Sequence, residues 1–90
     1  MSLAAAHDLS IRQLQYVVAV ADTLGFHRAA EKCGVSQPTL SSQIQKLEEV
    51  LGVQLFERTK QRVLLTKAGE AILHQARRIL GDVEDLITAA

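Results

Sequence analysis

The sequence predicts a mainly α-helical domain with one small β-hairpin, arranged as a winged helix-turn-helix and followed by a long linker or dimerisation helix. Three observations lead to this fold class. Two segments with helical spacing of apolar residues flank a short helix and a glycine-containing turn. Alternating apolar residues then follow Gly52, and a last apolar stripe of helical spacing covers residues 66–90.

Composition fits one small domain in a reducing cytoplasm. Hydrophobic residues make up 48% of the chain and aromatics are scarce, so we expect an aliphatic core and some apolar surface left for a partner. No apolar run approaches the roughly 20 residues of a membrane span. The start lacks the basic region of a secretory signal, and Cys33 is the single cysteine. We therefore expect a cytoplasmic protein with no membrane partner.

Charge is unevenly distributed, although the formal net charge is zero. Residues 11–67 carry eight basic and five acidic side chains, whereas residues 68–90 carry two basic and four acidic ones. A basic body and an acidic tail are compatible with binding of a polyanion through the body.

Two helices are expected at the start of the folded domain, which we place at residues 9–65 after a loose extension over residues 1–8. The first spans residues 9–24, where apolar positions cover about half of the helix circumference. The second is short, spans residues 27–34 and ends at Gly34, because glycine tolerates the positive φ of a helix terminus.

A third helix is expected to end at Gly52. Pro38 lies in its first turn, where a missing N–H costs nothing. Ser36 and Gln37 are both candidate caps. Because the residue before a proline avoids the helical region, we expect Gln37 to be the last non-helical residue.

This third helix is the candidate DNA-reading element. A steep crossing of two helices needs a small residue, a turn glycine and an aliphatic anchor, and Ala30, Gly34 and Leu40 supply them. In such a unit the second helix enters the major groove, where short hydroxyls and amides fit against base edges. The candidate contacts on it are Ser36, Gln37, Pro38, Thr39, Ser41, Ser42, Gln45 and Lys46. Arg28, on the short helix, is a candidate contact to the DNA backbone. The alternative for the third helix is an ordinary surface helix that is rich in Ser and Gln by accident.

The segment VQLFERTKQRVLL is expected to form the hairpin, or wing. Val53 and Leu55 alternate with polar residues on one arm, and Val63 and Leu65 lie on the other. Basic side chains near the turn suit phosphate or the minor groove, with an ordinary charged turn as the alternative. These basic residues are Arg58, Lys60 and Arg62.

The final helix, over residues 66–90, is expected to begin after a Thr66 cap, with a close backbone contact at Gly69. Its apolar residues step by three and four, the pattern of a helix packed along another helix. The residues expected at a dimer contact are Ile72, Leu73, Ala76, Ile79, Leu80, Val83, Leu86 and Ile87. Packing against the first helix of the same subunit is the alternative, and both arrangements can hold together.

No catalytic or metal-binding pattern accompanies these features. The three histidines are far apart and none lies at metal-ligand spacing from Cys33, which we expect to be a small buried hydrophobe. We therefore expect no enzyme activity, no metal and no cofactor. The competing function class is a winged helix that binds protein and associates with DNA only weakly.

The segments RAAE, VSQPTLSSQI, LEEVLGVQLFER and LTKAG occur together in the order found in the DNA-binding domain of LysR-type transcriptional regulators, which residues 11–80 resemble. Within that family, CGVSQPTLSSQIQKLE and FERT are most similar to the peroxide-sensing OxyR branch. The resemblance implies a bacterial, nucleoid-associated regulator that binds an inverted repeat in double-stranded DNA as a homodimer, or as a tetramer when full-length. It places DNA contacts on Ser36, Gln37, Pro38, Thr39, Ser41, Ser42 and Arg58.

Two departures from the family pattern affect these expectations. Many members carry Arg where this chain has Ser42, so one common base contact is expected to be missing. Members continue into an effector-binding domain that we expect to be absent from this chain. The reactive cysteines of the peroxide-sensing branch belong to that domain, so Cys33 does not inherit their role.

Overall fold

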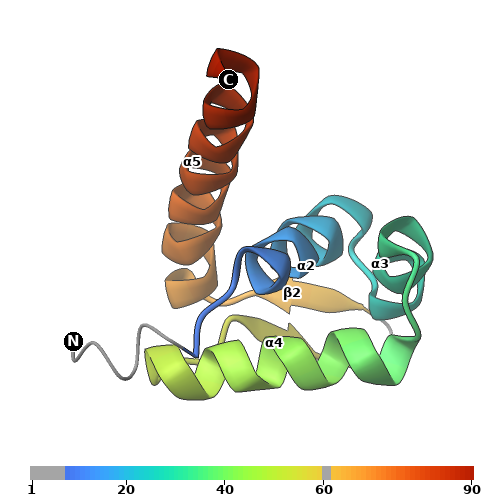
Figure 1. Ribbon diagram of the computed structural model, residues 1–90. Helices are drawn as coiled ribbons and strands as arrows, with labels where there is room; N and C mark the ends of the chain where they lie inside the picture. Colours follow the sequence, from blue (N-terminus) through green and yellow to red (C-terminus); the bar gives the residue numbers. More distant parts are fainter. Residues whose placement is uncertain (1–7, 60–61) are drawn as a thin grey trace.

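The structure, a computed structural model, describes residues 8–59 and 62–90 as a helical body with one antiparallel hairpin (Figure 1). This arrangement confirms the predicted fold class. The expected extension over residues 1–8 lies outside the described residues apart from Asp8, as does Lys60 of the wing. The elements are α2 (Ile11–Thr23), α3 (Phe26–Cys33), α4 (Gln37–Leu51), β1 (Phe56–Arg58), β2 (Val63–Leu65) and α5 (Lys67–Ala89).

The core is mainly aliphatic, as expected, and it also buries the chain's three aromatic residues, Tyr16, Phe26 and Phe56. Helix α2 lies at its centre in contact with α3, α4 and α5. The largest side chains that are fully buried come from α2, α4 and the segment before β1. Each such side chain contributes roughly 1.5–3 kcal/mol by leaving water. They are Val17, Val20, Leu40, Ile44, Leu47 and Leu55. None of the described helices is both long and apolar enough to cross a membrane.

Helix α2 begins with a capping box and ends in an unusual conformation. The Ser10 hydroxyl oxygen accepts a bond from the Gln13 backbone N–H at 3.1 Å, and the Gln13 side chain accepts one from the Ser10 N–H at 2.9 Å. Leu24 closes the helix in the left-handed region, with φ of 56°. That region costs a residue with a Cβ about 1–2 kcal/mol. Gly34 ends α3 in the same region at no such cost, as predicted.

The start of α4 differs from the prediction. Ser36 is extended and its hydroxyl accepts a hydrogen bond from the Thr39 backbone N–H at 3.2 Å, so Ser36 is the cap. Gln37 is already helical, and the expectation that it is the last non-helical residue was wrong. A satisfied N-terminal donor at Thr39 outweighs the backbone preference of the residue that precedes Pro38. Gly52 ends the helix as predicted.

The hairpin pairs Phe56 with Leu65 and Arg58 with Val63, but its first arm is shorter than expected. The alternation predicted to begin at Val53 was wrong, because Leu55 and Phe56 are both buried in succession.

A side-chain hydrogen bond accounts for the short arm. The Glu48 carboxylate accepts the Leu55 N–H at 2.7 Å, so this N–H is not available to extend the ladder beyond Phe56. The Gln54 amide also donates to the Phe56 carbonyl at 2.7 Å.

Helix α5 starts at the hairpin and leaves the body of the molecule (Figure 1). The Thr66 hydroxyl accepts the Gly69 N–H at 2.8 Å and donates to the Gln54 carbonyl at 2.6 Å, so the predicted cap also ties α5 to the segment before β1. The expected close contact at Gly69 is present, because a Cβ there would overlap the Leu55 carbonyl oxygen. The first turns of α5 pack on α2, while the end carries exposed apolar residues.

Candidate nucleic-acid interface

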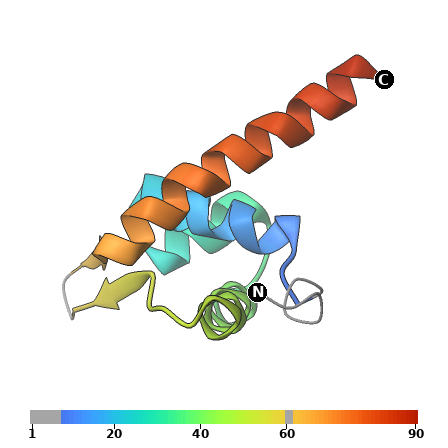
Figure 2. The ribbon, with the colours of Figure 1, turned by 90° about the vertical axis from the view of Figure 1, so that its left-hand side faces the viewer.

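Helix α4 forms one edge of the molecule, and α5 projects from the opposite side. Figure 2 views α4 nearly end-on, with the hairpin on one flank and the start of α2 on the other. The inward side of α4 is held by Leu40, Ile44 and Leu47, which are no more than 1% exposed. The outward side is therefore presented on a firmly packed support.

The polar residues predicted on α4 are gathered on this outward side. All are exposed except Ser41, which is half-buried. The Ser36 hydroxyl donates to the Thr39 hydroxyl at 2.8 Å, so these two groups are already ordered. Acidic side chains begin only at Glu48, near the far end of the helix. The first three turns thus offer hydroxyls, amides and Lys46 to a ligand, and no negative charge.

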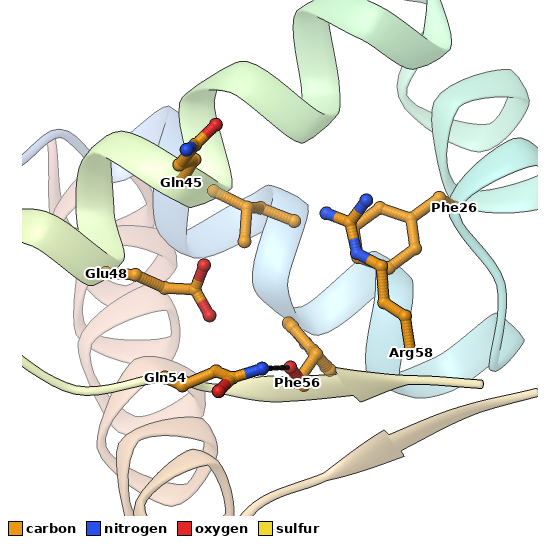
Figure 3. Close-up of a pocket in the computed structure, with 7 residues that line it drawn as sticks. Phe26, Gln45, Glu48, Gln54, Phe56 and Arg58 are labelled. Carbon is orange, nitrogen blue, oxygen red and sulfur yellow. Dashed lines mark hydrogen bonds between the residues drawn. The ribbon is translucent and has the colours of Figure 1, made fainter.

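The wing residue Arg58 lies against α3, which sequence reasoning did not predict. Its guanidinium carbon is 3.8 Å from the ring centroid of Phe26 (Figure 3). Phe26 in turn meets Phe56 edge-on, with ring centroids 5.9 Å apart. Stacking on an aromatic face holds an arginine without using its five N–H donors. Phe26 was missed because it is 32 residues from Arg58, and an apolar residue opening a helix usually indicates core.

A hollow connects the wing to α4. Its lining brings together Arg58 and Gln45, two predicted contact residues, with Glu48 across from Arg58 and Gln54 along the lower side (Figure 3). The other predicted cations that the structure describes do not line this hollow. Arg62 is exposed after the turn, where its backbone N–H donates to the Thr59 hydroxyl at 3.1 Å. Arg28 is exposed on α3 and Lys46 on α4.

The apolar stripe of α5 divides into two parts. Ala76 is 1% exposed and lies inside the chain's own core, so it cannot serve as the contact expected for it. Ile72, Leu73 and Leu80 also pack against this core while remaining partly exposed. The uncovered part is Ile79, Leu86 and Ile87, of which Leu86 and Ile87 are 71% and 70% exposed, while Val83 between them is half-buried.

Comparison with known proteins gives consistent matches. Residues 11–70 match the family of bacterial regulatory helix-turn-helix proteins called the lysR family. The DNA-binding transcriptional dual regulator OxyR of Escherichia coli is 54% identical over 78 residues, which is 87% of this chain and 26% of that protein. The chain therefore spans about a quarter of the length of the curated relatives it matches.

Solved structures agree on the fold. The BenM DNA-binding domain in complex with catB site 1 DNA is 40% identical with a TM-score of 0.87, over 90% of each chain. Full-length OxyR C199D from Pseudomonas aeruginosa is 44% identical with a TM-score of 0.86, over 90% of this chain and 28% of that one.

Proposed function

Because this chain belongs to the LysR family of bacterial regulatory helix-turn-helix proteins, we propose that it binds double-stranded DNA sequence-specifically with α4 in the major groove. The observation that carries the proposal is the outward side of α4, which is exposed, polar and free of acidic groups over its first three turns. An α-helix with its side chains is about 10–12 Å across, and the major groove is about 12 Å wide. Short side chains let such a helix enter deeply.

Base reading falls to the amides and the proline of α4. An amide pairs with adenine through two hydrogen bonds, which suits Gln37 and Gln45, and Pro38 offers an apolar surface to a thymine methyl group. Ser36, Thr39, Ser41 and Ser42 supply hydroxyls to bases or phosphates. The basic residues, among them Arg58 at the wing, raise the affinity for DNA by contacting its phosphate backbone. The remaining members of this basic set are Arg28, Lys46, Lys60 and Arg62.

The uncovered part of α5 supports a homodimer. Leu86 and Ile87 leave most of their apolar surface in water, which a second copy of the helix would cover. A two-fold dimer requires an inverted repeat with half-sites near a whole number of helical turns apart. In the full-length regulator the same helix would act as the linker of a dimer or tetramer that works on DNA in the bacterial cytoplasm.

The test compares binding to operator and random DNA after a genomic footprint has located an operator. Gln37→Ala is expected to weaken operator binding by about 1–3 kcal/mol and to leave random-sequence binding nearly intact. Thr88→Ala is the control, because Thr88 is exposed near the end of α5, away from α4 and from the apolar stripe of α5. Equal losses on both DNAs would remove Gln37 from base reading, and binding that is weak and abolished by salt on every DNA would favour a protein partner.

A further inference from the structure

Apart from Tyr16, whose hydroxyl accepts a hydrogen bond from Arg12, Gln13 is the one buried residue with a polar side chain among residues 8–59 and 62–90, being 3% exposed. We propose that Gln13 orients the amide of Gln43, and that Gln43 donates a hydrogen bond to a DNA phosphate on the flank of α4 away from the hairpin. This inference rests on the proposed DNA binding and adds two residues to it.

The orientation follows from donors and acceptors taken in order. The Ser10 backbone N–H can only donate, so the Gln13 atom that meets it at 2.9 Å is the carbonyl oxygen. The other end of that amide is then the NH₂ group, which donates to the Gln43 carbonyl oxygen at 3.3 Å. Gln43 must therefore direct its own NH₂ away from Gln13. These two hydrogen bonds, which begin at the cap of α2, therefore fix the direction in which the Gln43 NH₂ group points.

The position of Gln43 suits the DNA backbone better than a base. It is half-buried on the side of α4, whereas Ser42 and Lys46 beside it are exposed. In Figure 2 the start of α2 lies along this flank, opposite the hairpin. A helix that fills the major groove has one phosphate strand on each side. The wing faces one strand, and Gln43 faces the other.

The charges around this flank make the direction of the donor important. Gln43 borders a hollow that is also lined by Lys46, Asp8 and Glu49. One cation and two carboxylates give no net attraction for a phosphate. A neutral N–H donor held in place can still bind a phosphate oxygen, and an amide turned the other way would present a carbonyl oxygen and repel it.

The first experiment replaces the donor itself. Gln43→Met removes the NH₂ at similar size and is expected to weaken binding about 10-fold, the effect of one hydrogen bond to a charged group. Gln43→Glu still accepts from Gln13 but offers the phosphate a negative oxygen, so a larger loss is expected. Thr88→Asp adds a negative charge at the exposed end of α5, away from this flank and from the apolar stripe, and should bind nearly as well as the unaltered chain. Unchanged affinity of Gln43→Met would overturn the proposal.

The second experiment locates the phosphate. Duplexes in which one phosphate at a time is an uncharged methylphosphonate are titrated with the unaltered chain and with Gln43→Met. One position per half-site should weaken the unaltered chain and have little further effect on the variant. Equal sensitivity of both proteins at every phosphate would overturn the contact, even if Gln43→Met binds weakly. Failure of the unaltered chain to prefer any duplex sequence would overturn the proposed function as well.

The positioning role of Gln13 has its own readout. Gln13→Glu keeps an acceptor for the Ser10 N–H, but its second oxygen can only accept, so the Gln43 amide must reverse. Affinity is expected to fall about 10-fold, with no further fall when Gln43→Met is added. Additive losses would show that Gln13 acts independently of Gln43. Thermal unfolding shows whether each Gln13 variant folds. If Gln13→Glu does not fold, the proposal is judged on the Gln43→Met and methylphosphonate results.

Discussion

Substitution of Gly69 by alanine tests how α5 is joined to the rest of the domain. The added Cβ would overlap the carbonyl oxygen of Leu55 and lie 3.0 Å from the Leu65 side chain. Backbone cannot move aside as a flexible side chain can. The Leu55 carbonyl also accepts the Thr66 N–H at 3.0 Å, so a shift of either partner strains the cap of α5.

The size of the effect follows from three contributions. Overpacking costs about 1–3 kcal/mol, and loss of one backbone hydrogen bond costs about 1 kcal/mol. Alanine favours a helix over glycine by about 1 kcal/mol, which offsets part of this cost. The free energy of unfolding should therefore fall by about 1–3 kcal/mol. At 4–8 °C per kcal/mol for a domain of this size, a central loss of about 2 kcal/mol lowers Tm by roughly 8–16 °C.

Gly81→Ala in the same helix is the matched control, because a Cβ at that position would have nothing within 4 Å among the described residues beyond its chain neighbours and the backbone of its own helix. It should raise the free energy of unfolding by up to about 1 kcal/mol. Both variants are compared with the unaltered chain by thermal and urea unfolding at one protein concentration, since any self-association adds to stability. A Gly69→Ala protein as stable as Gly81→Ala would refute the close approach of α5 to Leu55.

Three further predictions concern the wing, the α2 terminus and the end of α5. Arg58→Ala should weaken binding to all DNA sequences and reduce the slope of log affinity against log salt by about one unit, and an unchanged slope would contradict a phosphate contact. Leu24→Gly should stabilise the domain by about 0.5–1 kcal/mol in urea unfolding, because Leu24 is 65% exposed at φ of 56°, whereas Leu24→Ala should give no such gain. Leu86→Asp should produce monomers in sedimentation, whereas Thr88→Asp, about 200° around the helix from Leu86, should not. A dimer that persists in both variants would exclude this stretch of α5 from the interface.

Local patterns were sufficient for the skeleton of the fold. Apolar spacing located the helices, Gly34 and Gly52 marked two helix ends, and the Thr66 cap and the close contact at Gly69 were both predicted and found. Apart from the contact at Gly69, whose partner Leu55 lies fourteen residues earlier, each of these features depends on residues within one or two turns of the chain. Such short-range preferences can be read before any tertiary contact is known.

Apart from the start of α4, where the local Ser36 cap decides the boundary, the errors and omissions arose where contacts between residues farther apart in the chain override local preference. The first arm of the hairpin begins at Phe56 because the side chain of Glu48, seven residues earlier, takes the N–H of Leu55. The placement of Arg58 on Phe26 and the bond between Gln13 and Gln43 link positions about thirty residues apart. No periodicity in the sequence indicates such pairs. The residues predicted on α4 nevertheless lie on the outward side of the helix, because helical periodicity alone determines which residues share a side.

The resting position of Arg58 bears on the thermodynamics of DNA recognition. A mobile arginine loses about 2 kcal/mol of rotamer entropy when it is fixed at an interface. Here the Phe26 ring already restricts that side chain, so part of the loss occurs when the domain folds. The wing can then bind DNA with a smaller loss of side-chain entropy. In a family of related wings, a change of the ring under the arginine would alter affinity although every contact with the duplex stayed the same.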